Sequence, residues 1–312
     1  MEILFQAELE SSIFATTALI ATAGVASADI ALSGGANFGI LSNGTAGAEV
    51  QIYNNASVTA SMSSATDNGL EFGASVTFRK GDDVDLDVGD LGKNDSDNDG
   101  KIDQLGDISF GNIFLSGAFG TLTIDSDGID NLMDDAYSHD MMYEYAVGSL
   151  SFGVTADIDN DYAEYADGER FSLKVEYDAA PVKVTLLADD SSDADLTVNY
   201  ALNDMIGLRL NYDTDGQTVA GVAEAETIIR ASIKSGDLSG HVAFANDDDD
   251  QWEIGLGYSA NGLSLGAVLA EDGAGTDTEM DLTASYDLGG GASLRAATNE
   301  TGAYFLGAAL KF

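Results

Sequence analysis

The chain ends with Ala303-Tyr304-Phe305-Leu306-Gly307-Ala308-Ala309-Leu310-Lys311-Phe312, and this stretch decides the fold. Every second residue, counted back from Phe312, is apolar or small. A period of two places these side chains on one face of an extended chain, so the stretch is predicted to be a β-strand with one apolar face. An aromatic residue at the very end is unusual, because chain ends normally fray in water.

The same alternation extends back through the chain to Asp29 and divides it into eighteen predicted strands. These strands cover residues 30–40, 46–61, 68–79, 105–116, 119–125, 140–147, 149–157, 169–178, 181–188, 194–202, 205–213, 224–234, 237–246, 251–259, 262–270, 278–287, 291–298 and 302–312. Alternate connections are short turns such as Asn203-Asp204 and Asn261-Gly262. The others are longer and acid-rich, at 81–104, 126–139, 158–168, 189–193, 214–223, 246–250 and 271–277.

Charged residues within these strands fall on one face. In the segment 171–177, Lys174 and Glu176 lie opposite the apolar row that begins at Phe171. The same parity places further basic residues on the polar face, namely Arg79, Lys183, Arg209, Arg230, Lys234, His241, Arg295 and Lys311. A soluble β-sandwich also alternates, but eighteen half-apolar strands would have to share its single core. A closed barrel that holds water accounts for both faces, so we predict an all-β, transmembrane antiparallel β-barrel.

Composition narrows the function. The 312 residues include 36 glycines, one proline and no cysteine, which suits a β-protein and excludes disulfides and thiolate metal sites. Acidic residues outnumber basic ones 54 to 12, a formal charge of −42. This balance argues against a nucleic-acid partner and favours cations as passengers or loop ligands. A soluble protein from a salty habitat is the alternative explanation of such acidity.

The N-terminal region has the pattern of a signal peptide. Residues 13–25 form an apolar core, and Ala26-Ser27-Ala28 follows as a cleavage site. The first twelve residues depart from the pattern because they contain three glutamates and no Lys or Arg. We therefore predict a signal peptide over 1–28 and a single barrel domain over 29–312, which carries 51 acids and 12 bases, a formal charge of −39.

Several sequence segments resemble those of a known family. They are Ala28-Asp29-Ile30-Ala31-Leu32-Ser33-Gly34, Gly69-Leu70-Glu71-Phe72-Gly73-Ala74, Phe119-Gly120-Thr121-Leu122-Thr123-Ile124, Tyr286-Asp287-Leu288-Gly289-Gly290-Gly291-Ala292 and the terminal Phe312. Over nearly its whole mature length the chain is similar to the Rhodobacter-like general porins of alphaproteobacteria. The resemblance implies an outer-membrane homotrimer in contact with lipid and lipopolysaccharide, and usually sixteen strands, so 16 to 18 are expected. It also implies that Phe312 is part of the signal read by the barrel-assembly machinery.

The resemblance further implies a third loop that folds into the lumen and forms the constriction. Its carboxylates would be Asp125, Asp127, Asp130, Asp134 and Asp135. The facing positive side would be drawn from Arg79, Arg209, Arg230, Lys234 and Arg295.

An acidic motif in the stretch 81–104 has calcium-loop spacing. Asp95-Ser96-Asp97-Asn98-Asp99-Gly100 matches the start of such a loop, and the candidate ligands are Asp95, Asp97, Asp99, Lys101 and Asp103. Gly106 stands where the bidentate Glu is expected, so we expect weak Ca²⁺ binding, with Kd of roughly 10⁻⁴–10⁻³ M. A solvated acidic loop is the alternative.

Taken together, the sequence predicts a general diffusion porin that passes ions and small hydrophilic solutes passively and prefers cations. A substrate-specific channel and a calcium-binding outer-membrane adhesin are the alternatives. An enzyme is not expected, because the sequence offers no evident nucleophile-and-base set.

Overall fold

The computed structural model of the protein describes residues 29–44, 50–84, 86, 102, 104–133, 138–158, 170–190, 193–219, 222–246, 251–271 and 278–312. These residues form strands and their connections, with no helix among them. It follows that no helix in this part of the chain is long and apolar enough to cross a membrane.

The strands follow one another along the chain, joined by short turns and by longer connections. In chain order they are β1 (Asp29–Asn43), β2 (Gln51–Ala65), β3 (Glu71–Asp82), β4 (Gln104–Leu105), β5 (Ile108–Gly117), β6 (Gly120–Asp130), β7 (Ser138–Val147), β8 (Leu150–Ala156), β9 (Phe171–Ala179), β10 (Val182–Asp189), β11 (Ala194–Ala201), β12 (Ile206–Val219), β13 (Val222–Ser235), β14 (Leu238–Asn246), β15 (Trp252–Ala260), β16 (Leu263–Glu271), β17 (Thr278–Gly289), β18 (Ala292–Thr298) and β19 (Ala303–Lys311).

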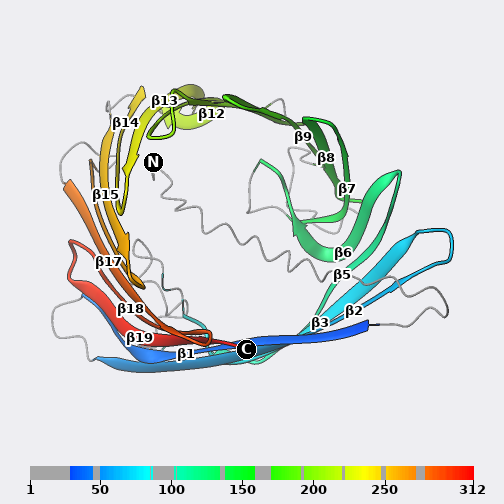
Figure 1. Cartoon of the computed structure of the whole chain (residues 1–312), viewed down its shortest axis with the longest axis horizontal. Helices are drawn as coiled ribbons and strands as arrows, with labels where there is room; N and C mark the ends of the chain where they lie inside the picture. The colour runs from blue at the N-terminus through cyan, green and yellow to red at the C-terminus, as the bar shows by residue number, and fades with distance from the viewer. Residues whose placement is uncertain are drawn as a thin grey trace.

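The sheet closes on itself. Each long strand pairs antiparallel with the next, and β19 pairs back onto β1 from Gly35↔Lys311 to Asn43↔Ala303. The two-residue β4 pairs only with the end of β3, while β3 also pairs directly with β5, so the ring has eighteen members. Figure 1 shows this ring, with β1, β2 and β3 forming a flattened side. The expected barrel is confirmed, with eighteen strands rather than the sixteen usual for the family that it resembles.

The two faces of the ring differ as the alternation predicted. Large apolar side chains such as Leu32, Phe110 and Leu256 are more than 65% exposed on the outer face. Charged and hydroxyl side chains occupy the alternate positions, which face the lumen. Ring closure pairs the backbone of every long strand on both sides, as a lipid environment requires.

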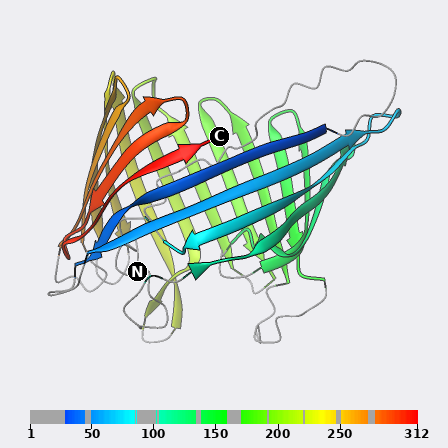
Figure 2. The same ribbon diagram turned by 90° about the horizontal axis from the view of Figure 1, so that it is seen from below.

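Short turns and longer connections lie at opposite ends of the barrel. The short turns use residues suited to tight reversal, such as Gly148 (φ 61°) and Asn261 (φ 52°). Asp29 and Phe312 belong to this end because the ring has an even number of strands. Figure 2 shows β1, β2 and β3 as long, steeply tilted strands, and the β12–β13 hairpin projecting past its neighbours at the long-connection end.

Two predicted loops were partly wrong. The stretch 214–223 is mostly strand, because β12 runs to Val219 and β13 begins at Val222. A register shift after Asp213 is followed by renewed pairing from Gln217↔Glu224 to Val219↔Val222. Likewise β6 continues to Asp130, five residues into the predicted loop 126–139. In both places the ladder is interrupted by an irregularity, after Ile124 and after Asp213, and pairing resumes beyond it among residues that resemble loop sequence.

Candidate pore lumen and constriction

A cavity of about 1540 Å³ lies along the inner wall formed mainly by β12 to β19. Its lining includes basic side chains of Arg230, Lys234 and Arg295 and acidic side chains of Glu253 and Asp281. The surface that water meets inside the barrel is therefore charged with both signs. Such a lining can attract ions and orient polar solutes.

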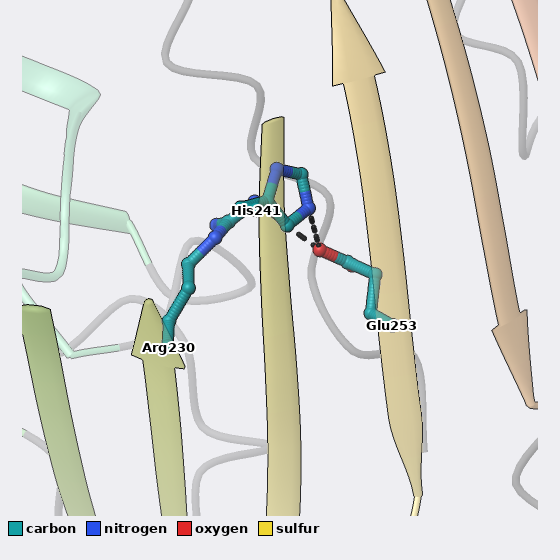
Figure 3. A network of polar contacts seen from close by, with 3 residues as sticks. All are labelled: Arg230, His241 and Glu253. Atoms are coloured by element: carbon teal, nitrogen blue, oxygen red, sulfur yellow. Dashed lines mark hydrogen bonds and ion pairs between the residues drawn. The ribbon is translucent and has the colours of Figure 1, made fainter. Parts of the chain in front are cut away.

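One lumenal cluster joins three neighbouring strands (Figure 3). Glu253 on β15 accepts from Arg230 Nη2 on β13 at 3.1 Å and lies 2.5 Å from His241 Nε2 on β14. The Glu253 side chain is 2% exposed, so its charge is held between two basic groups rather than facing water. Gly255 makes the arrangement sterically feasible, because a Cβ there would lie 2.0 Å from His241 Cε1.

A second cluster lies on β9 and β10. Glu176 is 3.8 Å from Lys174 Nζ and 3.3 Å from Lys183 Nζ, and it accepts from Thr185 Oγ1 at 3.4 Å. The two lysines are more than 40% exposed, so these ion pairs contribute little to stability. These charged groups instead contribute to the local electrostatic field within the pore.

The predicted basic residues are only partly brought together. Arg209 on β12 stands directly opposite Arg230 on β13, and Lys234 follows four residues later on β13. Arg295 lies on β18, where its guanidinium is 5.9 Å from the Phe305 ring centroid. Arg79 lies apart at the end of β3, where its backbone N donates to Asp107 O at 3.1 Å. These placements leave the constriction role of the five cations a prediction.

The predicted acidic side has a different setting from the one expected. Asp125 lies in β6, as the predicted strand 119–125 implies, but Asp127 and Asp130 also lie in β6 rather than in the predicted loop. Asp134 and Asp135 lie outside the described residues. The role of these five carboxylates at the constriction stays a prediction.

The chain after β6 does turn into the lumen. Leu132 N donates to Ser172 Oγ on β9 at 2.9 Å, although β7 and β8 separate β6 from β9 in the ring. Ser172 in turn contacts Thr155 on β8, and Thr155 Oγ1 lies 2.8 Å from His139 Nδ1 on β7. These contacts place the segment 131–133 across the inner face of β7, β8 and β9. They anchor the described start of the predicted third loop to the inner wall.

Two predicted sites remain, the calcium-binding motif and the terminal Phe312. The candidate calcium ligands Asp95, Asp97, Asp99, Lys101 and Asp103 lie outside the described residues. Among the residues that the structure does describe, no group of three or more His, Asp or Glu side chains could hold a metal ion. Phe312 pairs with Gly34 through both backbone groups, and its ring is 70% exposed on the outer face.

Glu253 was not selected from the sequence as a functional residue. Its parity, opposite to Ile254 and Leu256, already placed it on the polar face. Its partners could not be inferred, because cross-strand register determines which side chains meet. The inner-wall aromatic Phe305 was missed for a different reason, since an apolar residue was not expected on the lumenal face.

The closed eighteen-stranded ring, apolar outside and charged inside, defines a pore-forming barrel of the membrane-spanning type. A family model of Gram-negative porins matches residues 15–303, so the chain belongs to the Gram-negative porin family. This membership agrees with the resemblance to alphaproteobacterial porins and places the protein in the outer membrane.

Solved porin structures share the fold. Two engineered triple mutants of Rhodopseudomonas blastica porin match with TM-scores of 0.53 and 0.54, each at 17% identity. A third engineered variant of the same porin matches with a TM-score of 0.52 at 18% identity. Each alignment covers 91% of this chain and 100% of the other chain. No curated protein gives a significant match.

Proposed function

We propose that the protein is a general diffusion porin, which passes ions and small hydrophilic solutes through a water-filled channel without catalysing a reaction. The observation that carries the proposal is the closed ring with a charged inner wall. A channel of this kind selects by the size of its narrowest point and by the electrostatic potential along its wall.

We further propose a preference for cations. The chain from residue 29 onward carries a formal charge of −39, and its long connections are acid-rich. Carboxylates at the pore mouth raise the local cation concentration, and this effect weakens as salt screens the charges. The opposite charges of paired lumenal groups, such as Arg230 and Glu253, cancel each other. The net negative charge of the chain therefore determines the sign of the potential.

Liposome swelling tests the diffusion mechanism. Refolded protein in liposomes should admit neutral sugars at rates that fall steadily with sugar size and rise linearly with concentration. Saturation by one sugar, with competition from a second, would instead indicate the substrate-specific channel. A shift in gel mobility on heating identifies protein that is a folded barrel. If such protein admits no sugar, the result would favour the adhesin.

The assembly of the protein is also part of the proposal. By family resemblance we propose a homotrimer, inserted by the barrel-assembly machinery and surrounded by lipid and lipopolysaccharide. Cross-linking of the detergent-solubilised protein, followed by gel electrophoresis without heating, would distinguish a trimer from a monomer.

Calcium binding is proposed from the sequence motif alone. Calorimetric titration of the folded protein with Ca²⁺ should show binding with Kd of roughly 10⁻⁴–10⁻³ M. Replacement of Asp97 by Asn should abolish that heat, whereas replacement of Asp237 by Asn in the β13–β14 turn should not. Unchanged heat in the Asp97→Asn protein would assign the binding to other carboxylates.

A further inference from the structure

The inner wall carries an apolar patch where a water-filled pore would be expected to be polar. It consists of Leu41 on β1, Tyr53 on β2, Ala297 on β18, and Ala303 and Phe305 on β19. The pairings Leu41↔Phe305 and Ala297↔Phe305 place them on one face, and their neighbours Ile40, Ile52 and Leu306 are exposed on the other. Every member is at most 6% exposed. Something within the barrel therefore covers this patch.

The covering residues come from the segment that connects β3 to β5. Ile102 is buried in the same cluster, and Val84 and Leu86 pack against it. Leu86 also lines the lumenal cavity, so it has the patch on one side and the pore on the other. We call these three side chains and the patch beneath them the apolar latch.

The backbone at the end of β3 is shaped for this inward turn. Gly81 has φ of 120°, and a Cβ there would lie 2.3 Å from Asn54 O. Asp82 Oδ2 then accepts from Asn54 N at 2.6 Å, and Asp82 O accepts from Asn55 Nδ2 at 3.0 Å. The chain is thus bound to the start of β2 immediately before Val84 and Leu86. Such a built entry distinguishes the latch from incidental contact of a surface loop.

We propose that Val84, Leu86 and Ile102, three described residues between β3 and β5, form a second constriction element on the wall of β1, β2, β18 and β19. The third-loop segment 131–133 is bound to β7, β8 and β9, a different part of the ring (Figure 1). The pore is then narrowed from two walls, and the apolar side chains of Val84 and Leu86 set its size on one of them. The inference deepens the proposed diffusion function and rests on it for its effect on transport.

Cysteine accessibility tests the latch without measuring transport, and the chain has no native cysteine. Ala297→Cys places a small thiol in the patch, under the covering side chains. Thr283→Cys places one directly across the ladder on β17, where the wall is exposed. A water-soluble maleimide should label position 297 at least about ten-fold more slowly than position 283. Adding Val84→Ser and Leu86→Ser should remove most of that difference. Equal labelling at both positions with the native segment present would overturn the proposal.

Single-channel conductance then tests the effect on the pore. Conductance follows the open area of the narrowest point, so the Val84→Ser, Leu86→Ser protein should conduct roughly two-fold more than the native protein. Leu187→Ser on β10 makes a like change at another lumenal position and should leave conductance unaltered. If the native protein and the double variant show conductance steps of equal size, the second constriction is refuted and the porin function still stands. Absence of native steps would refute the porin function, and labelling would still decide the latch.

Discussion

Large side chains that lean over glycines shape the inner wall. His241 occupies the space above Gly255, which allows it to reach Glu253. Tyr53 lies across β1 onto β19, with its hydroxyl over Gly39 and Gly307. In both places the missing Cβ leaves room for a neighbour from another strand. The lumenal glycines therefore determine which side chains can meet.

Replacement of Gly307 by Ala should destabilise the barrel. The added Cβ would lie 2.2 Å from Tyr53 Oη and 2.6 Å from Phe38 O, so the seam between β19 and β1 would have to shift. Overpacking of this kind costs about 1–3 kcal/mol, which a lower urea midpoint of unfolding would report. The control is Gly153→Ala, whose Cβ would meet only ordinary contacts from 3.6 Å. Equal midpoints for the two variants would contradict this account of Tyr53.

Replacement of Glu253 by Gln should reduce the cation preference. The change removes one negative charge from the inner wall and leaves Arg230 without its ion-pair partner there. Two unit charges 4 Å apart in water interact by about 1 kcal/mol, so the permeability ratio should fall by no more than about five-fold. The reversal potential measures it. Asp237→Asn makes the same charge change in the β13–β14 turn and should have a smaller effect; an equal effect would disprove a specific lumenal role for Glu253.

At the scale of elements, strand register explains what joins the third loop to the wall. Thr155 and Ser172 are ladder partners on β8 and β9, and their hydroxyls face the lumen together. Ser172 is then placed to accept from Leu132 N. A buried hydroxyl pair on the barrel wall thus becomes the docking point of a loop.

Replacement of Ser172 by Ala should loosen that docking. The Leu132 amide would lose its acceptor in a partly buried site, at a cost of about 1–3 kcal/mol. Its hydrogen exchange should accelerate by roughly 5- to 150-fold if exchange follows local opening. Ser151→Ala, two positions before Gly153 on the same inner face of β8, provides the control. Unaltered exchange at Leu132 in the Ser172→Ala protein would show that other contacts hold the segment.

Alternation in the sequence predicted most of the strands. The apolar outer row of β9 or β19 is readable residue by residue, because every outward position meets lipid. Prediction failed where strands leave that environment, as in the outer part of the β12–β13 hairpin. It also could not foresee the clusters at Glu253 or Ser172, because these depend on which residues of different strands face each other.

At the scale of the whole molecule, the last residue extends the seam that closes the barrel. Phe312 N donates to Gly34 O at 3.0 Å, and Gly34 N donates to Phe312 O at 2.7 Å. The ring of Phe312 lies on the outer face against Gly34. The alternation that ends at Phe312 therefore extends the seam to the short-turn end of the barrel.

Replacement of Phe312 by Ala should lower the yield of folded protein in the outer membrane. The backbone pairing with Gly34 can persist, but the exposed ring available to the assembly machinery is lost. The fraction of outer-membrane protein whose gel mobility shifts on heating measures the yield. Lys311→Ala alters the adjacent lumenal residue and should preserve it. A normal yield of folded Phe312→Ala protein would show that the terminal ring is not part of the assembly signal.

We propose that this eighteen-stranded barrel is an open, cation-preferring pore. The decisive experiment is single-channel recording of the refolded protein in a planar bilayer with a salt gradient across it. We expect stepwise conductance and a reversal potential of the sign set by cations, and this potential should shrink as total salt rises. An anion-selective reversal potential would contradict the acidic pore, and absence of steps from folded protein would contradict the open channel itself.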